Sequence, residues 1–513
     1  MTSALRNTST SHSKGGAPDT STQDSTSRRR WLAMAVLLLP VLLVSIDNTV
    51  LSFALPQIST TLAPSSTQML WIIDIYPLVL AALLVPMGSF ADRFGRRRML
   101  LLGGAGFAVV SVVAAFAPSA GALIATRAAM GIFGAMLMPS TLSLLRNIFT
   151  DRNERRFAIA IWAAGFAAGA ALGPIVGGFL LEHFWWGSVF ILAVPVLVPL
   201  LILGPIFLPE SRNESPGPID FASIAMVFVA MAALVFGIKE FATDGITASA
   251  LAIFILGLAM GFLFVRRQLR LPTPMLDMSL FTRGAFSGAV LVNLLSVFAL
   301  VGFLYFASQE LQLVHGLSPM TAGLVLVPGL IGMVAAGLLS VPAVKRWRPV
   351  VVVCFGLGFS AVGYALIAGG TGSLVMLIGA FVVLAIGIGA TETVSNDLII
   401  SAVPAEKSGA ASAISETAYE FGAVLGTAVL GSILNAIYRS HLSGPNATAA
   451  DTLGGAHQAA AQLPAEQANS LVRSANDAFA SGVGVTAAIG AVLMVAAMGL
   501  AARMLREPRP SAE

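Results

Sequence analysis

Charged side chains are scarce in this sequence. Asp, Glu, Lys and Arg make up 11% of its 513 residues, whereas soluble domains carry about 25%. The mean hydropathy is +0.86. A soluble chain of this length needs far more polar surface, so the composition excludes most soluble enzymes and disordered scaffolds. It fits a protein solvated mainly by lipid, in which each spanning helix uses about 20 apolar residues.

Several groups of reactive or ligand-binding residues are also missing. Cys354 is the only cysteine, which excludes an intramolecular disulfide and argues against a thiolate metal site. The five histidines form no His-Glu-x-x-His pattern, and none of the four lysines follows a glycine, so a zinc site and a Walker A loop are both absent. The net charge is only +4 and its cations are scattered, which argues against nucleic-acid binding. We therefore expect no metal, no other cofactor and no enzymatic activity.

Apolar runs dominate what is present and predict an all-α membrane protein with 14 transmembrane helices. The predicted spans are 32–55, 71–90, 99–117, 120–144, 157–181, 187–208, 219–239, 247–265, 285–309, 320–343, 350–369, 373–398, 409–437 and 481–503. The predicted organisation is a disordered cytoplasmic tail (1–30), a six-helix half (31–208), an inserted two-helix hairpin (219–265), a second six-helix half (285–503) with an outer loop (440–480), and a short cytoplasmic tail (504–513).

The distribution of cations sets the expected orientation. With both termini in the cytoplasm, 25 of the 29 Lys and Arg residues fall in tails or inner loops, as the positive-inside rule requires. Lys239, Arg439 and Arg473 fall outside, and Arg127 lies within a span. Arg outnumbers Lys 25 to 4, which is typical of a GC-rich bacterial source. We therefore expect a multi-pass protein of the bacterial cytoplasmic membrane.

A weak internal repeat relates the two halves. The fifth and thirteenth spans both follow a charged inner loop and both carry closely spaced glycines. Repeated six-helix halves are typical of transporters, because one half can rock on the other. Two segments leave alternatives open: 219–265 is one hairpin or a poorly spanning pair, and 440–480 is a lid or a solvated loop.

Ionisable groups inside spans are costly and are functional candidates by default. Asp47 is expected to couple protons or sense cargo charge, or else to form a structural ion pair with Arg127, the single buried cation. Asp74 lies near the outer end of its span, where it acts in transport or simply reaches water. Glu392 is expected to pass protons inward, or else to bond with polar side chains of a neighbouring helix.

Glu416 and Glu420 lie one helical turn apart on one face. Two carboxylates in a low dielectric resist double ionisation, so one is expected to hold a proton until a cation arrives. Tyr419 lies on an adjacent face, where its ring could stack on a delocalised cation. The alternative is that both acids are protonated and hydrogen-bond between helices.

Two motifs lie at helix ends and interfaces. The inner loop after the second span contains Gly88, Asp92, Arg93, Gly95 and Arg96, an acid among cations that could latch helix ends together. The fifth span carries a face of small residues that would let another helix approach closely, followed by a kink at proline. The residues of this second motif are Gly165, Gly169, Gly173, Pro174, Gly177 and Gly178.

Together these motifs resemble the major facilitator superfamily. The order of residues 88–98 is similar to its loop 2–3 signature, and 165–178 to its antiporter motif. Ile46 to Val50, Asp74, Arg127 and 416–420 resemble the fourteen-span drug:proton antiporters, within them the QacA-type and LfrA-like multidrug efflux pumps. The resemblance covers nearly all of 31–505 and implies the superfamily's fold.

The resemblance also implies proton-driven export of lipophilic cations, such as quaternary ammonium compounds and ethidium. The implied partners are those cations, protons and the lipid bilayer, with the protein acting as a monomer. Ser415 departs from the QacA pattern, which has an acid there, and the tenth span has no acid. Both differences argue against broad capacity for divalent cations. The alternative cargo is an endogenous metabolite, antibiotic or lipid, because the fold alone does not set the substrate.

Overall fold

The computed structural model describes residues 20–213, 219–243, 245–370, 373–403, 408–442 and 451–505, and within these ranges every regular element is helical. The elements are α1 (Thr20–Leu62), α2 (Ser66–Phe94), α3 (Arg96–Ala115), α4 (Ala120–Ile148), α5 (Arg152–His183), α6 (Ser188–Ile191), α7 (Ala193–Phe207), α8 (Phe221–Thr243), α9 (Ala248–Gln268), η1 (Met278–Thr282), α10 (Gly284–Gln309), η2 (Glu310–Val314), α11 (Pro319–Leu324), α12 (Val327–Arg346), α13 (Pro349–Ala368), α14 (Leu374–Ser401), α15 (Ser408–Gly426), η4 (Thr427–Gly431), α16 (Ser432–His441), α17 (Leu453–Ala460) and α18 (Ala465–Met504).

Fourteen helices in the described ranges are long and apolar enough to cross a membrane. This confirms the predicted number, and each overlaps one predicted span. Residues 219–265 form two such helices. The predicted ends were wrong at two places. Residues 20–30, which we assigned to a disordered tail, are helical. The rest of that predicted tail, residues 1–19, lies outside the described ranges. The last helix begins at Ala465 and not at residue 481, because 465–480 contains no Gly and no Pro to interrupt it.

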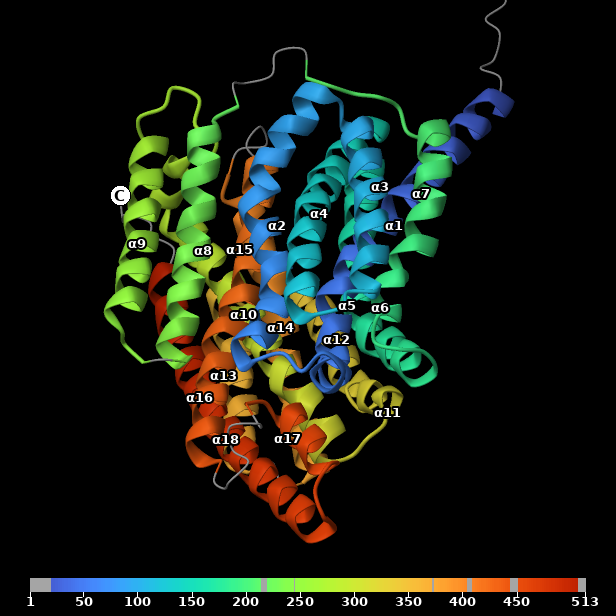
Figure 1. Ribbon diagram of the computed structural model, residues 1–513. Helices are drawn as coiled ribbons and strands as arrows, with labels where there is room; N and C mark the ends of the chain where they lie inside the picture. The colour runs from blue at the N-terminus through green and yellow to red at the C-terminus, as the bar shows by residue number, and fades with distance from the viewer. Residues whose placement is uncertain are drawn as a thin grey trace, which may run out of the picture.

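The helices form two groups and a separate pair (Figure 1). We call α1–α7 the N-group and α10–α16 with α18 the C-group. Helices α8 and α9 pack mainly against each other, and α8 also contacts α2, α16 and η4. The loop between α2 and α3 lies at one end of the molecule, with residues 93–98, and α11 and α17 lie at the opposite end. We name these the basic end and the α17 end.

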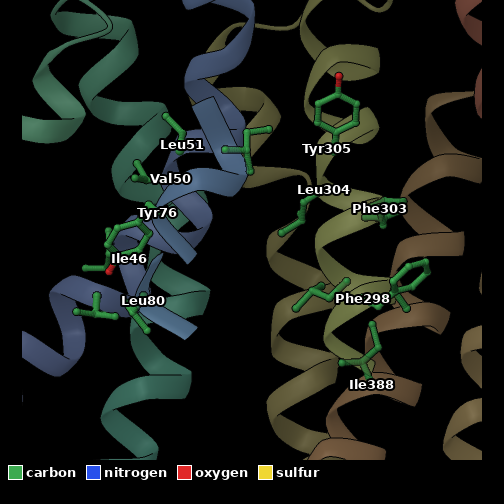
Figure 2. Packing of buried hydrophobic residues seen from close by; sticks show 14 of the residues in the cluster. Ile46, Val50, Leu51, Tyr76, Leu80, Phe298, Phe303, Leu304, Tyr305 and Ile388 are labelled. Carbon is green, nitrogen blue, oxygen red and sulfur yellow. The ribbon is translucent and has the colours of Figure 1, made fainter. Parts of the chain in front are cut away.

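Apolar side chains from both groups make up the core. Figure 2 shows Ile46, Val50, Leu51, Tyr76 and Leu80 on the N-group side, with Phe298, Phe303, Leu304, Tyr305 and Ile388 on the C-group side. The rings of Phe303 and Phe381 stack with centroids 4.8 Å apart. These residues are buried, whereas many apolar side chains elsewhere are exposed, as expected of a surface that faces lipid.

The glycine face of α5 packs on α1, which is the kind of close helix approach that the sequence predicts. A Cβ on Gly169 would lie 2.8 Å from Cβ of Ser45, and one on Gly177 would lie 2.7 Å from Cγ2 of Val50. Gly178 has a different neighbour, because its Cβ would meet Met320 of the C-group at 2.7 Å. Small residues therefore allow close contact both within the N-group and between the groups at the α17 end.

Two carboxylates hold the α17 end closed, and each lies on the N-terminus of a helix from a distant part of the chain. Glu182 of α5 accepts hydrogen bonds from the Ser318 hydroxyl (2.8 Å) and the Met320 amide (3.1 Å) at the start of α11. Asp451, just before α17, accepts from the Ser66 amide at the start of α2 (2.8 Å). Among the side chains that the structure describes, no hydrogen bond or ion pair joins the two groups at the basic end. The molecule is therefore closed at the α17 end.

Residues 453–460 belong to this closure. The predicted outer loop contains α17, whose Leu453 and Ala456 are buried and which packs on α1 and α18. A loop solvated throughout is therefore wrong for these residues, whereas 443–450 lie outside the described ranges. The lid remains a prediction.

Replacing both capping carboxylates should open the α17 end. In a Glu182→Gln/Asp451→Asn variant each cap loses its charge, and capping contacts contribute about 0.5–2 kcal/mol each. We expect a cysteine at Leu51, in a Cys354→Ser background, to react faster with a membrane-impermeant maleimide added from the α17 side. Glu466→Gln, an exposed acid at the same end, is the control. An unchanged labelling rate would contradict this role for the caps.

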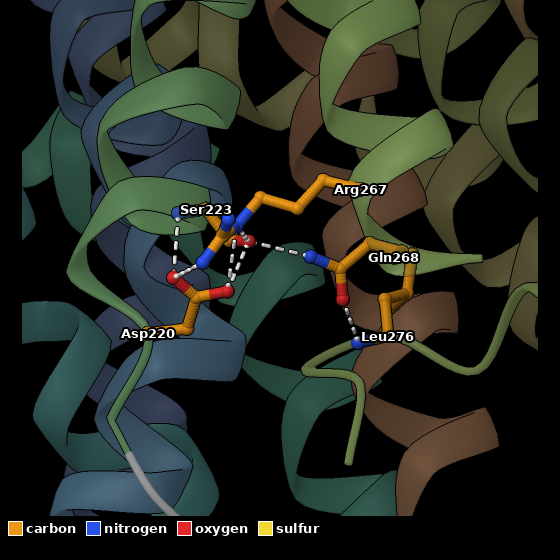
Figure 3. A network of polar contacts seen from close by, with 5 residues as sticks. All are labelled: Asp220, Ser223, Arg267, Gln268 and Leu276. Atoms are coloured by element: carbon orange, nitrogen blue, oxygen red, sulfur yellow. Dashed lines mark hydrogen bonds and ion pairs between the residues drawn. The ribbon is translucent and has the colours of Figure 1, made fainter. Parts of the chain in front are cut away.

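A polar network closes the α8–α9 pair at the basic end (Figure 3). Asp220 receives two hydrogen bonds from the Arg267 guanidinium, at 2.9 and 3.1 Å. Ser223 donates to Asp220 at 2.6 Å and accepts from Gln268 at 2.6 Å. Gln268 in turn accepts from the Leu276 amide at 3.1 Å. The guanidinium of Arg267 is the main cause that lowers the pKa of Asp220 to about 2.

The stability of this pair of helices should fall in acid. A lowered folded-state pKa stabilises the protein above the ordinary value of 3.8, and that contribution is lost as the pH falls through about 2. Because Arg267 is partly exposed, we expect no more than about 1 kcal/mol. Hydrogen exchange of α8 and α9 amides measures this opening. Asp220→Asn should remove both the protection from exchange and its dependence on pH. If exchange in that variant still accelerated in acid as in wild type, the Asp220–Arg267 ion pair would be excluded as the cause.

Candidate functional site

A buried ion pair lies between α1 and α4. The Nη1 atom of Arg127 is 2.6 Å from Oδ2 of Asp47, and their side chains are 2% and 6% exposed. The guanidinium also lies over the Tyr76 ring, 4.5 Å from its centroid, and its Nε donates to the Ile72 carbonyl at 3.4 Å. The pair that the sequence analysis offered as an alternative is therefore present, and in this state Arg127 neutralises Asp47.

Glu420 is a buried acid at the contact between the two groups. Its Oε1 accepts a hydrogen bond from Asn48 Nδ2 at 3.1 Å, which joins α15 to α1. Its Oε2 has no hydrogen-bond partner, and no cation pairs with it among the described residues. Asp47 and Arg127 are close enough to contribute to its electrostatic environment. Glu420 is thus the central acid whose charge the protein leaves uncompensated.

A small cavity beside these groups is shared by both helix groups. Its lining includes Asn48, Ile73 and Arg127 from the N-group with Leu300 and Tyr419 from the C-group. The ring of Tyr419 meets Phe166 of α5 edge-on, with centroids 5.3 Å apart. The predicted aromatic residue beside the acids is therefore on the wall of the central cavity.

Two further acids lie between this cavity and the basic end. Glu416 and Glu392 are each partly exposed, and Arg146 is the charged group that acts on Glu416. Glu392 is close enough to influence Tyr419 electrostatically. It has no hydrogen-bond or ion-pair partner in the described residues, so the alternative of a polar partner on a neighbouring helix is not observed. Asp397 is exposed on the same helix. The acids become more exposed from Glu420 toward the basic end.

The environment of Asp74 corrects the prediction of which charged side chains are buried. Lys239, which we counted at the outer end of the span 219–239, is buried in α8, with its Nζ 2.9 Å from Oδ2 of Asp74 and side-chain exposures of 1% and 0%. Arg127 is therefore not the single buried cation, and Asp74 does not reach water. The sequence hid this pair because Lys239 ends an apolar run and precedes Glu240, a pattern typical of a span terminus.

The loop 2–3 motif binds its own helix group in this state. Asp92 accepts from Nη2 and Nε of Arg96 at 2.8 and 3.0 Å. The Arg96 amide donates to the Ser211 carbonyl at 2.9 Å, and Glu210 lies 3.8 Å from Nε of Arg97. Arg93 is exposed, and Gly88 packs near Pro139. The motif therefore anchors the segment after α7, and a latch to the C-group is not observed among the described residues.

Gly95 is fixed by backbone geometry as well as by space. Its φ is +108°, and an added Cβ would lie 2.7 Å from Oε1 of Glu210. Side chains rarely adopt such a φ. We expect Gly95→Ala to destabilise the protein by about 1–3 kcal/mol, seen as a lower melting temperature in nanodiscs. Melting at the wild-type temperature would show that the loop adapts without strain.

The part of the chain that the structure describes contains no candidate metal-binding site. No group of three or more His, Cys, Asp or Glu side chains there could hold a metal ion. The polar chemistry between the helix groups is thus that of carboxylates, two basic side chains, amides and aromatic rings.

Comparisons with known proteins agree with this architecture. A sequence model of the Major Facilitator Superfamily matches residues 37–427. The chain is 56% identical over 491 residues to the multidrug efflux pump LfrA of Mycolicibacterium smegmatis, covering 94% of this chain and 97% of that protein. It is 35% identical to the methyl viologen resistance protein SmvA of Salmonella typhimurium (92% and 98% covered). It is also 32% identical to the tetracenomycin C resistance and export protein of Streptomyces glaucescens (91% and 90% covered).

Solved structures share the fold. A bacterial homologue of the human lysosomal transporter Spinster, in an inward-facing and unoccupied conformation, superimposes with a TM-score of 0.67 at 19% identity, covering 94% of this chain and 99% of that one. A peptide transporter of the POT kind in complex with sulfate gives 0.61 at 15% identity, with 93% and 96% covered.

Proposed function

This chain belongs to the major facilitator superfamily, and we propose that it is a proton-coupled antiporter that exports lipophilic cationic drugs and dyes. The carrying observation is the state of Glu420, buried between the helix groups without a cation, while Asp47 and Asp74 each have one. A buried carboxylate needs either a proton or a cation. Glu420 can therefore exchange one for the other, which is the chemistry of an antiporter.

Glu416 and Glu392 extend this site toward the basic end. We place that end in the cytoplasm with both termini, which makes the state described here inward-facing. A cation entering from the cytoplasm meets the partly exposed acids first, and then Tyr419 and Glu420. Protons loaded from outside displace the cation after the α17 end opens. The two ligands compete for the same negative charge, so coupling needs only that the empty, charged site disfavours the conformational change.

The role of Asp47 follows from its pairing. Arg127 already compensates its charge, so we assign Asp47 and Arg127 to holding the electrostatic balance around Glu420. Asn48, the next residue, then binds Glu420 directly. Protonation of Glu420 leaves this hydrogen bond possible, whereas a bound cation would draw the carboxylate away from Asn48. The contact between α1 and α15 therefore reports on what Glu420 binds.

A transport assay tests the proposal directly. Purified protein in proteoliposomes should move ethidium and a quaternary ammonium compound against their gradients when a pH gradient is imposed, and a protonophore should abolish this. A neutral antibiotic is the third arm, because the chain resembles a protein named for tetracenomycin C export. Transport of the neutral compound alone would favour the alternative cargo. Uptake that ignores the pH gradient would overturn proton coupling.

A further inference from the structure

The buried lysine of the α8–α9 pair occupies a setting that suits a cationic ligand. Nζ of Lys239 lies 2.9 Å from Oδ2 of Asp74 and 3.8 Å from the centroid of the Trp71 ring. A carboxylate beside the face of an indole is the combination that binds organic ammonium ions in proteins. The ammonium found there is that of Lys239, which reaches the position from α8.

This position lies where three parts of the molecule meet. Asp74 and Trp71 belong to α2 of the N-group and Lys239 to α8. Thr427, which is close enough to influence the same carboxylate, belongs to η4 of the C-group, and η4 contacts α2. Element η4 is a π-helical turn, a distortion often found at functional sites. Ile73 and Pro77, on either side of Asp74 in α2, line the central cavity. Any rocking of the C-group against the N-group changes the surroundings of this carboxylate.

Holding α8 in place does not require the charges. Apolar residues of α8 already pack between α2 and the α15–η4 segment, including Met231 and Val235 against Leu78 and Val424. A buried ion pair adds little or nothing to stability compared with apolar residues of similar size. The pair is thus a costly feature at a contact that apolar packing already makes, which favours a role in binding.

We propose that Asp74 and Trp71 form a second cation-binding position, which Lys239 fills as a tethered ammonium while the α17 end is closed. A cationic head group reaches Asp74 only after α8 withdraws this lysine. Lys239 is therefore a specificity-determining residue, because it decides whether one or two carboxylates are open to a cation. Its use in transport rests on the proposed function, whereas the binding position itself does not.

Chemical rescue tests the binding position without transport. Lys239→Ala leaves a space of the shape of the lost side chain opposite Asp74. We expect n-butylammonium to raise the melting temperature of this variant in nanodiscs by several degrees, rising with concentration as binding to the native state requires, and n-butanol to leave it unchanged. Wild type, the exposed-lysine variant Lys345→Ala, and Asp74→Asn/Lys239→Ala should show no rise with the amine.

A second variant keeps the test decisive where Lys239→Ala folds poorly. Lys239→Met retains the apolar stem and frees Asp74, so we expect it to bind ethidium at least about tenfold more tightly than wild type, since close charge pairs contribute that much or more. Asp74→Asn/Lys239→Met should return to wild-type affinity. The proposal is overturned if Lys239→Ala has the same melting temperature with n-butylammonium as with n-butanol. It is also overturned if Lys239→Met binds ethidium with wild-type affinity. Failure of wild type to bind ethidium would instead contradict the proposed function, leaving the n-butylammonium result to decide this position.

Discussion

An Asp47→Asn variant should lose proton-driven export of ethidium and also lose stability. The substitution leaves the Arg127 guanidinium, 2% exposed, without its counter-ion. Removing one partner of a buried pair costs about 3–5 kcal/mol, because the remaining charge is uncompensated. The freed guanidinium would also be drawn to Glu420, an acid without a cation on which Arg127 already acts electrostatically, and would thereby block the site. Dye efflux from cells and the melting temperature of purified protein measure the two effects.

A double variant separates these causes. Asp47→Asn/Arg127→Gln removes both charges, so we expect the melting temperature to recover toward wild type. If Asp47 and Arg127 serve only to balance charge around Glu420, part of the efflux should recover with it. If the carboxylate of Asp47 itself carries protons, efflux stays absent in a stable protein. Full ethidium export by Asp47→Asn alone would exclude both roles.

Glu420→Gln should separate transport from its proton drive. Gln keeps the oxygen that accepts the hydrogen bond from Asn48 but cannot exchange a proton for a cation. Coupling free energies between two ligands of 1–3 kcal/mol correspond to about 5–150-fold effects. We therefore expect ethidium accumulation driven by a pH gradient to fall by roughly two orders of magnitude. Exchange of labelled for unlabelled ethidium with no pH gradient should persist more weakly.

The control for this prediction is an acid away from the helix contact. Glu466→Gln, on the exposed start of α18, should transport like wild type in both assays. Glu416→Gln is informative as well, since its partly exposed position predicts a smaller loss than at Glu420. Undiminished pH-driven accumulation by Glu420→Gln would show that the proton travels by another acid.

The transmembrane helices could be predicted because lipid imposes a simple rule. Apolar length alone identifies a span, and this located all fourteen. The pairing of Asp47 with Arg127 was accessible for a similar reason, as a buried arginine needs an acid and few were available. Spacing also placed Glu416 and Glu420 on one face, yet it could not show that only Glu420 is fully buried, because that depends on Asn48 of a helix 372 residues away.

Lys239 shows where sequence reasoning fails. Hydropathy assigns a charge at the edge of an apolar run to the membrane surface. The partner that draws it inward lies on α2, far away in the chain, and no local pattern announces it. The two carboxylate caps at the α17 end were missed for the same reason, since each depends on how one helix group meets the other.

The contact between Lys239 and Asp74 also restricts how such a chain can be shortened. Removing the α8–α9 pair, with residue 213 joined to the segment before α10, would leave twelve spans. It would also remove the Lys239 ammonium from a carboxylate that is 0% exposed and expose to lipid the apolar side of α2 that α8 now covers. A working twelve-span descendant would need a proton or another cation on Asp74, or a neutral residue in its place, so the loss of two helices changes what one buried carboxylate must bind.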